Sequence, residues 1–439
     1  MVAVAIGFIN PIAMSLTEVL LGVMAGCWLL AGGYRERMRA IVCNPVALAT
    51  LAMLALITVS LLYGEAPWSH SLRGWAKYRN LVYLVLFITI FRTAKMREAG
   101  LWAFGLAMVL TLVFSYLTAA GMPPIENRYT LRPHNAVVFR NHIVHGLCMG
   151  LFAYLMAHRF AEQPRRRWYL GVLCLLAMVN VLFMVASRTG YITLAVMIPL
   201  FCVQRLRLRT LVAAGVAVVA LGVVGHFHSE IFTQRLQDAR AEVEAYLAYH
   251  FGDGPIKPEG WRRPVTRTSC GVRLEWYRIG LEMMKERPLL GVGAGSVHYH
   301  MQQSSKKGDK HGAPPTDNLH SEYVMFAAQN GVPGLVLFGI FLVAYWRSRR
   351  KLSPRMRQLA EGTLLMLMVA GTANTLLTER TEGVLFVFCA GLAFAELSER
   401  AVRQRWVSPE HGTAAADETA PDADLDAAEG APSPLSRAA

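Results

Sequence analysis

Apolar stretches long enough to cross a membrane recur along almost the whole chain, with short polar segments between them. A hydrocarbon core of roughly 30 Å is crossed by about 20 helical residues. The recurring stretches therefore predict an all-α, polytopic membrane protein with about twelve transmembrane helices. The expected spans lie near residues 2–14, 16–32, 44–63, 79–92, 100–120, 143–158, 169–186, 190–204, 211–226, 321–346, 359–376 and 383–396.

The connections that follow the even-numbered spans are rich in Lys and Arg. Short loops of this kind are retained in the cytoplasm during insertion. The alternation therefore predicts that both termini are cytoplasmic and that the remaining connections face outward. The basic residues that define it are Arg35, Arg37, Arg39, Arg92, Lys95, Arg97, Arg159, Arg165, Arg166, Arg167, Arg205, Arg207, Arg209, Arg347, Arg349, Arg350, Lys351, Arg355 and Arg357.

One polar segment, from about residue 228 to residue 318, is too long and too polar to lie in a membrane. On the predicted topology it forms a large extracytoplasmic loop. Within it, residues 234–250 and 271–287 carry helix-forming residues at amphipathic spacing, with a Gly- and Pro-rich stretch around residues 251–264 between them. We therefore expect a helical loop with two surface helices.

These features divide the chain into four parts. Residues 1–226 are expected to hold nine transmembrane helices, residues 227–320 the large loop, and residues 321–398 the last three helices. Residues 399–439 form a cytoplasmic tail. After Trp406 this tail is rich in Ala, Pro, Asp and Glu and has almost no large apolar side chains, so we expect it to be disordered.

The composition and charge agree with lipid as the solvent. Hydrophobic residues make up 54% of the chain and charged residues only 17%, against roughly 25% charged residues in soluble domains. The net charge is 44 − 30 = +14. Because most basic residues lie in topological loops, we expect attraction to anionic membrane lipids and no nucleic-acid partner. Only Cys270 of the seven cysteines falls in the polar loop, so no disulfide framework or cysteine metal site is expected.

An outward-facing arginine marks the first candidate site. Arg188 lies in the turn Ser187-Arg188-Thr189-Gly190, which is so short that its side chain must sit at the outer face between two spans. One interpretation is an arginine that reaches lipid headgroups. The positive-inside bias nevertheless makes a lone outer Arg exceptional. An anionic substrate group, such as a lipid phosphate, would provide its partner.

Two further residues of the loop could carry chemistry. Arg273 lies near the start of the second predicted loop helix, where its charge opposes the helix dipole unless an anion binds both. His320 lies where the polar loop meets a long apolar span, which is also a common place for a merely interfacial histidine. A neutral imidazole can accept a proton from a hydroxyl group, and Asp317 or Glu322 could orient it.

Other outer residues are weaker candidates. Arg140 and Arg380 are outward-facing on the predicted topology and could support the site from a distance. The glycines of residues 288–296 allow a tight turn or a close approach to a ligand, but their spacing is not that of a nucleotide-binding loop. His298 and His300 form no metal-binding spacing, and we expect them to lie in a polar loop.

Together these residues resemble those of the O-antigen ligase family, which is related to O-antigen polymerases and protein O-oligosaccharyltransferases. The resemblance covers most of the chain after about residue 130. Its motif is His320-Ser321, a nine-residue spacer and Gly331-Val332-Pro333-Gly334. The Arg188 turn and the stretch from Arg273 to Gly295 are similar to other recurrent features of the family.

The resemblance implies transfer of a glycan from an undecaprenyl diphosphate donor to a hydroxyl group of lipid A-core. The reaction would take place at the periplasmic face of the bacterial inner membrane, without a cofactor or a metal ion. Arg188 and Arg273 would bind the diphosphate, with Arg140 and Arg380 as further substrate-binding candidates, and His320 would act as general base. No carboxylate pair is placed for a double displacement, so we expect inversion at the anomeric carbon.

Three other functions remain open from the sequence. An O-antigen polymerase would use the same class of donor with a carrier-linked acceptor. A protein O-oligosaccharyltransferase would use a Ser or Thr of a secreted protein. A secondary transporter would also have a dozen helices, but it should show an internal repeat with broken helices, and it has little need for a loop of this size.

Overall fold

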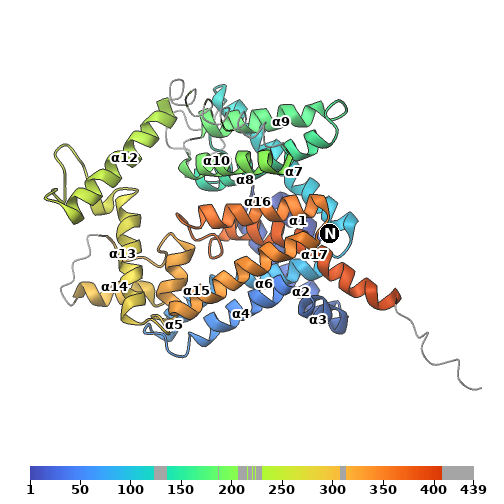
Figure 1. Cartoon of the computed structure of the whole chain (residues 1–439), viewed down its shortest axis with the longest axis horizontal. Helices are drawn as coiled ribbons and strands as arrows, with labels where there is room; N and C mark the ends of the chain where they lie inside the picture. The colour runs from blue at the N-terminus through green and yellow to red at the C-terminus, as the bar shows by residue number, and fades with distance from the viewer. Residues whose placement is uncertain are drawn as a thin grey trace, which may run out of the picture. The chain divides into compact units, whose positions relative to one another are not determined.

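The computed structural model describes residues 1–122, 136–185, 187–205, 230–306 and 313–407, together with residues 215, 220 and 223. Every regular element within these ranges is a helix (Figure 1). This confirms the expected all-α class.

Eleven of the twelve expected spans coincide with helices. The remaining expected span, residues 211–226, is the ninth along the chain and lies almost wholly outside the described residues. The tail after residue 407 also lies outside them. The helices are α1 (Val2–Ile9), α2 (Met14–Leu30), α4 (Pro45–Val59), α6 (Arg79–Ile90), α7 (Ala94–Ala119), α8 (His142–Glu162), α9 (Trp168–Val179) with a π-helical continuation (Asn180–Met184), α10 (Arg188–Arg205), α15 (Glu322–Ser348), α16 (Pro354–Ala370) and α17 (Arg380–Val407).

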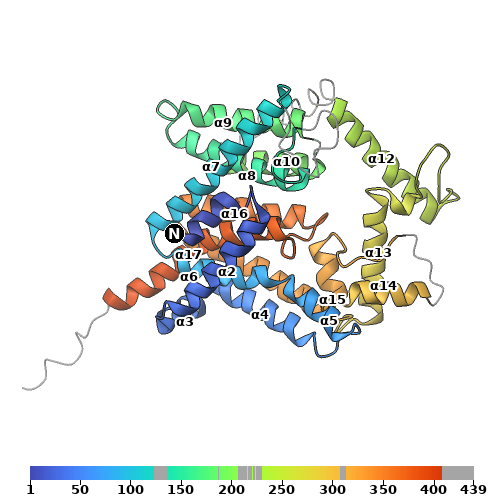
Figure 2. The same ribbon diagram turned by 180° about the vertical axis from the view of Figure 1, so that it is seen from behind.

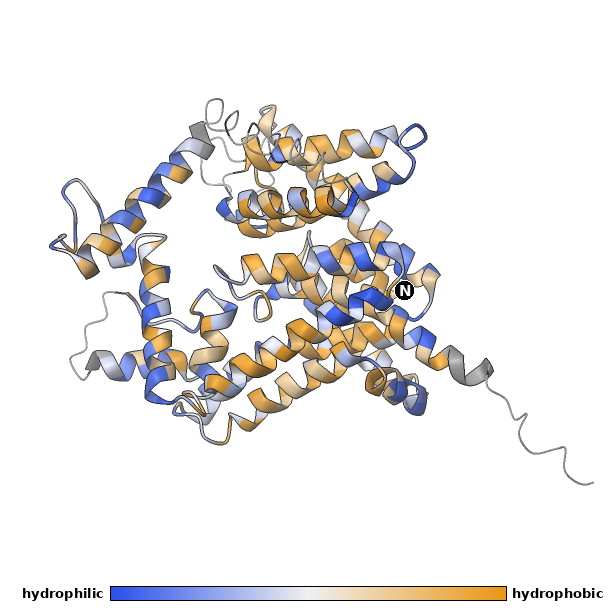
Figure 3. Cartoon of the chain, in the orientation of Figure 1, coloured by the Kyte–Doolittle hydropathy of each residue, from blue (hydrophilic) through white to orange (hydrophobic). Residues whose placement is uncertain are grey.

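Fewer of these helices are individually long and apolar enough to cross a membrane. Within the described ranges four meet that standard, α7, α8, α15 and α17, and a fifth span is obtained if α2 and α3 (Tyr34–Val42), bent by 113°, are taken together. Figure 3 shows apolar residues concentrated on the helices of the bundle. The structure therefore describes a membrane protein with several spans, and the number of about twelve stays a prediction.

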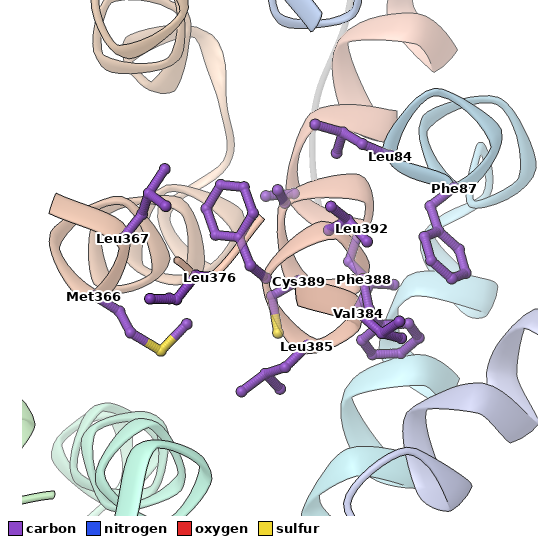
Figure 4. Packing of buried hydrophobic residues seen from close by; sticks show 14 of the residues in the cluster. Leu84, Phe87, Met366, Leu367, Leu376, Val384, Leu385, Phe388, Cys389 and Leu392 are labelled. Atoms are coloured by element: carbon purple, nitrogen blue, oxygen red, sulfur yellow. The ribbon is translucent and has the colours of Figure 1, made fainter. Parts of the chain in front are cut away.

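The centre of the bundle is the apolar part of α17, whose candidate span is 94% buried. Its Phe388 ring packs edge-on against Phe87 and Phe91 of the α6 region, with ring centroids 5.5 Å and 5.6 Å away. On another face, Figure 4 shows α17 beside Leu367 of α16. Because this packing surrounds α17, it anchors the loop that precedes α17. That loop reaches the functional site.

The large loop is helical, as expected. It contains α12 (Glu230–Phe251) and α13 (Gly271–Glu286), close to the two predicted helices. Figures 1 and 2 show α12, α13 and α14 (Val297–Lys306) beyond one end of the bundle. His298 and His300, expected in a polar loop, lie on α14 within this segment, and that helix was not predicted. The short helix α5 (Trp68–Ala76), in the connection between α4 and α6, was also not predicted.

The helix α15 is broken at Gly331, which has φ 60° and ψ −151°. Pro333 has no N–H group, so the carbonyl of Gln329 loses its helical donor. The N–H of Val332 also turns away from the carbonyl of Ala328. Two backbone carbonyls are therefore released in the middle of an otherwise apolar helix, where an unpaired polar group would cost free energy.

The glycine-rich segment 288–293 supplies the missing partners. The bonds run from the N–H of Val292 to Ala328 (2.9 Å), from Gly293 to Gln329 (3.0 Å) and from Val332 to Pro288 (2.7 Å). This approach requires glycine at Gly331, since a Cβ atom there would lie 2.3 Å from the carbonyl oxygen of Pro288. The Gly-x-x-Gly motif and the upstream glycine stretch therefore form one junction, which fixes the loop against α15.

Candidate functional site

Arg188 and Arg273 meet at one hydroxyl group. Arg188 begins α10 and Arg273 lies in the first turn of α13. Their Nη1 atoms lie 3.4 Å and 3.2 Å from Oγ of Ser269, and Arg273 also donates to the Ser269 carbonyl (2.9 Å). The Nε atoms of both arginines are buried without a hydrogen-bond partner among the described residues. Two cations held together with spare donors favour an anionic ligand, because buried unpaired donors are costly.

A carboxylate partly balances this pair. Oε2 of Glu242, on α12, lies 3.8 Å from Nη1 of Arg188 and accepts the backbone N–H of Cys270 at 2.6 Å. The thiol of Cys270 in turn lies 3.1 Å from Arg188. Burial raises the pKa of this thiol, with Arg188 acting in the opposite direction and Glu242 in the same direction. In the sequence Glu242 looks like an ordinary residue of an amphipathic helix, and only the structure brings it to Arg188.

His320 occupies a strained turn immediately before α15. Its φ of 53° is in the left-handed region, which is uncommon for a residue with a side chain. The side chain of Asn318 accepts the His320 N–H at 2.7 Å. The hydroxyl of Tyr277, on α13, lies 2.9 Å from the His320 carbonyl and 2.7 Å from that of Thr372. These bonds tie the loop, the turn and the connection between α16 and α17 together.

The imidazole of His320 is largely enclosed. It stacks on the indole of Trp276, one turn along α13 from Arg273, with centroids 5.1 Å apart and planes 17° apart. Its Nδ1 atom is buried and has no hydrogen-bond partner within the described part of the chain. Burial and, to a smaller extent, the charge of Arg273 lower the pKa of His320 to about 4, against the opposing effect of a hydrogen bond with Asn374. The imidazole is therefore neutral at physiological pH.

The two carboxylates considered as partners of His320 lie elsewhere. Oδ2 of Asp317 faces Lys77 at 3.5 Å, and Glu322, buried at the start of α15, accepts the backbone N–H of Leu377. Asn374 is the residue that bonds the imidazole. Asn374 has no local signal in the sequence, because it lies more than fifty residues from His320, between two apolar stretches.

Arg140 and Arg380 belong to the surroundings of this site. Arg140, just before α8, donates to the hydroxyl of Thr381 at the start of α17. Arg380 is exposed and interacts electrostatically with Glu379, whose Oε1 accepts from Asn318 at 2.8 Å. Asn318 holds the backbone of His320, so the structure links Arg380 to the turn through two residues. It places neither arginine on the Arg188 and Arg273 pair.

The described residues thus form a membrane protein of apolar helices in which a cationic pair lies near an enclosed histidine. Residues 173–339 match a family model described as O-antigen ligase. The match agrees with the resemblance of the motifs, and the matched segment contains Arg188, Arg273 and His320. It supports a function of the O-antigen ligase or polymerase type. No curated protein matches the chain.

Proposed function

We propose that the protein is a lipopolysaccharide O-antigen ligase. It transfers a glycan from undecaprenyl diphosphate to a hydroxyl group of lipid A-core at the periplasmic face of the inner membrane. The observation that carries this proposal is that Arg188 and Arg273 meet at Ser269, and that Arg273 lies on the same helix, α13, as Trp276, which stacks on His320.

The arginine pair is suited to a diphosphate. Guanidinium groups bind phosphate oxygens through paired N–H donors, and the pair offers two guanidinium groups from different helices. Negative charge develops on the diphosphate as the bond to the sugar breaks, so donors already in place stabilise the transition state. In the free protein the two cations repel each other. Binding of the anion relieves this repulsion.

His320 is suited to act as the general base. In the proposed step the acceptor oxygen forms a bond to the anomeric carbon and its proton passes to His320. The bond between that carbon and the diphosphate oxygen breaks, and undecaprenyl diphosphate leaves with the electron pair. A single displacement inverts the anomeric carbon. A bound diphosphate also offsets the charge of Arg273, which makes His320 a stronger base when the donor is present.

The reaction is proposed to need no metal ion or cofactor. Among the described residues no group of three or more His, Cys, Asp or Glu side chains is placed to hold a metal. In the proposed reaction the two arginines stabilise the developing negative charge. Activity in excess chelator tests this directly.

An O-antigen polymerase is the second candidate, because the family match supports either type. It would give the same dependence on Arg188, Arg273 and His320, but with a carrier-linked glycan as acceptor. A protein O-oligosaccharyltransferase would require a polypeptide acceptor, and a transporter would form no new glycosidic bond. The acceptor used by the purified protein therefore separates these functions.

The test is transfer of carrier-linked glycan to lipid A-core by purified protein in excess chelator. We expect activity in the wild type, a loss of roughly 10²–10³-fold in Arg188→Ala and of about 10²–10⁴-fold in His320→Ala. Lys257→Ala, which removes an exposed loop cation, is the matched control, and thermal unfolding in detergent checks each variant. Full activity in both site variants would overturn the assignment of the site. Transfer only to carrier-linked glycan would identify a polymerase.

A further inference from the structure

A cavity of about 250 Å³ lies beside the turn that carries His320. Asp317, three residues before His320, lines it, and so does Thr378, next to Glu379. Its other walls come from α5, α14 and α15. The cavity shares no lining residue with the group formed by Arg188, Ser269 and Arg273, so it is a separate space adjoining the same turn.

Glycines build one wall of this cavity. A Cβ atom at Gly74 of α5 would lie 2.2 Å from Cα of Gly295, and one at Gly295 would lie 2.6 Å from the carbonyl oxygen of His70. Gly295 also has φ +72°. The helix α5 can therefore lie against the glycine-rich stretch only because both positions lack side chains. The glycine-rich stretch has no chemical role in the proposed transfer reaction, but it forms one wall of the cavity.

Side-chain hydrogen bonds hold the same wall in place. The N–H of Ala66 donates to Oγ of Ser296 at 3.1 Å, and the N–H of Ala294 donates to Oγ of Ser60 at 3.1 Å. These bonds connect residues more than two hundred positions apart in the chain. The cavity is consequently a built feature of the fold, with its backbone groups satisfied on both sides.

The cavity is lined by basic side chains. Arg73 and Lys77 supply a guanidinium and an ammonium group, and His70 and His298 add two imidazoles. Asp317 is the acidic residue of the lining, 3.5 Å from Lys77 and 3.9 Å from Nδ1 of His298. Because its side chain is 61% exposed, these ion pairs are weak. A stronger anion could replace Asp317 as the partner of Lys77.

The predicted topology places α5 on the outer side, where basic residues are exceptional unless they have a function. The same consideration applies to Arg188. The glycan acceptor must bring its hydroxyl group to His320 without occupying the diphosphate position. A basic cavity that adjoins the turn of His320 through Asp317, and that shares no lining residue with the arginine pair, meets this requirement.

We propose that this cavity binds an anionic group, a phosphate or carboxylate, on the acceptor saccharide and so positions the acceptor hydroxyl at His320. The proposal rests on the function proposed above and adds a substrate class, an acidic acceptor glycan. Arg73 and Lys77 bind the anion, and the turn from Asp317 to His320 connects the bound group to the general base.

Acceptor kinetics test the proposal in the full-length protein. We expect Lys77→Gln and Arg73→Gln to raise the KM for a phosphorylated lipid A-core acceptor by about tenfold each. With an acceptor from which phosphate has been removed, wild type and variants should have the same, already raised, KM. Lys257→Gln is the charge-matched control. An unchanged KM for the phosphorylated acceptor in both variants would overturn the proposal.

A binding measurement separates this proposal from the transfer reaction itself. His320→Ala protein is titrated with glucose 6-phosphate, glucuronate and neutral glucose, and binding is followed by saturation-transfer NMR. We expect binding of one or both acidic sugars, weakened at least fivefold by Lys77→Gln, and none of glucose. Equal signals from all three sugars, or acidic-sugar binding unaffected by Lys77→Gln, would refute the cavity assignment even if transfer is confirmed. Absence of transfer together with the expected binding would refute only the proposed reaction.

Discussion

The indole ring of Trp276 lies nearly parallel to the imidazole of His320, with centroids 5.1 Å and planes 17° apart. The indole N–H donates to the carbonyl of Pro314 at 2.9 Å, which fixes the orientation of the ring. The large loop is therefore part of the proposed site, because it supplies the ring that stacks on the proposed base.

This stacking makes Trp276 a positioning residue. We expect Trp276→Ala to lower kcat by about 10–100-fold, since the imidazole loses its orientation. Removal of the ring also exposes His320, which should move the acid limb of the activity profile to higher pH. Trp276→Phe keeps a stacked ring without the hydrogen bond and should retain most activity. Equal losses in both variants, with no change in the pH profile, would indicate a purely structural role.

The lowered pKa of His320 predicts the pH dependence of transfer. The neutral imidazole is the active form, and burial with the charge of Arg273 places its pKa at about 4. Activity expressed as kcat/KM, which reports the free enzyme, should therefore stay constant as pH falls until about pH 4 and then decline. The acid limb of kcat should lie at higher pH, because bound diphosphate offsets Arg273.

Two measurements check this expectation. The pH profiles are determined at limiting and saturating donor, with activity restored at pH 7 after each exposure to exclude acid unfolding. In Arg273→Gln, which removes the charge, the acid limb of kcat/KM should move upward. A free-enzyme limb near pH 6.5 in the wild type would contradict the enclosed position of His320.

Glu242 should weaken donor binding. Its carboxylate lies 3.8 Å from Arg188 and competes with an incoming anion. We expect Glu242→Gln, which keeps an oxygen to accept the N–H of Cys270, to lower the donor KM by about threefold to tenfold, the size of a partly exposed ion pair. Glu244→Gln, on the exposed part of α12, is the control. A higher donor KM in Glu242→Gln would mean that the carboxylate instead organises Arg188 for binding.

Cysteine labelling tests both the topology and the site. In single-cysteine variants, a membrane-impermeant maleimide should label Cys270 from the periplasmic side and the exposed Cys43 only after the membrane is opened. Because burial raises the pKa of the Cys270 thiol above its usual value, labelling should be slow at pH 7 and should still accelerate above pH 9. Bound donor should slow it, since the thiol lies 3.1 Å from Arg188. The reverse pattern of access would overturn the predicted orientation.

Two glycines of α15 should respond oppositely to alanine. Gly331→Ala places a Cβ atom 2.3 Å from the Pro288 carbonyl at a positive φ, so we expect destabilisation by about 1–3 kcal/mol or more. Gly339→Ala meets no atom within 4 Å and should be neutral or stabilising by up to about 1 kcal/mol. Thermal unfolding in detergent measures both. Equal behaviour would show that the junction with residues 288–293 does not hold the helix break.

The sequence alone determined the helical class and the positions of most of the described helices, including the two loop helices, because local apolar spacing and composition set them. It also picked out Arg188, Arg273 and His320 as separate candidates, since each is a polar residue in an unusual position. Local patterns cannot specify which distant segments meet. Only the tertiary structure decided that both arginines contact Ser269, that Trp276 and Asn374 enclose His320, and that α5 packs on Gly295 beside the same turn. These are contacts between segments up to more than two hundred residues apart, and they are decided by the packing of the helices around α17 and by the break in α15.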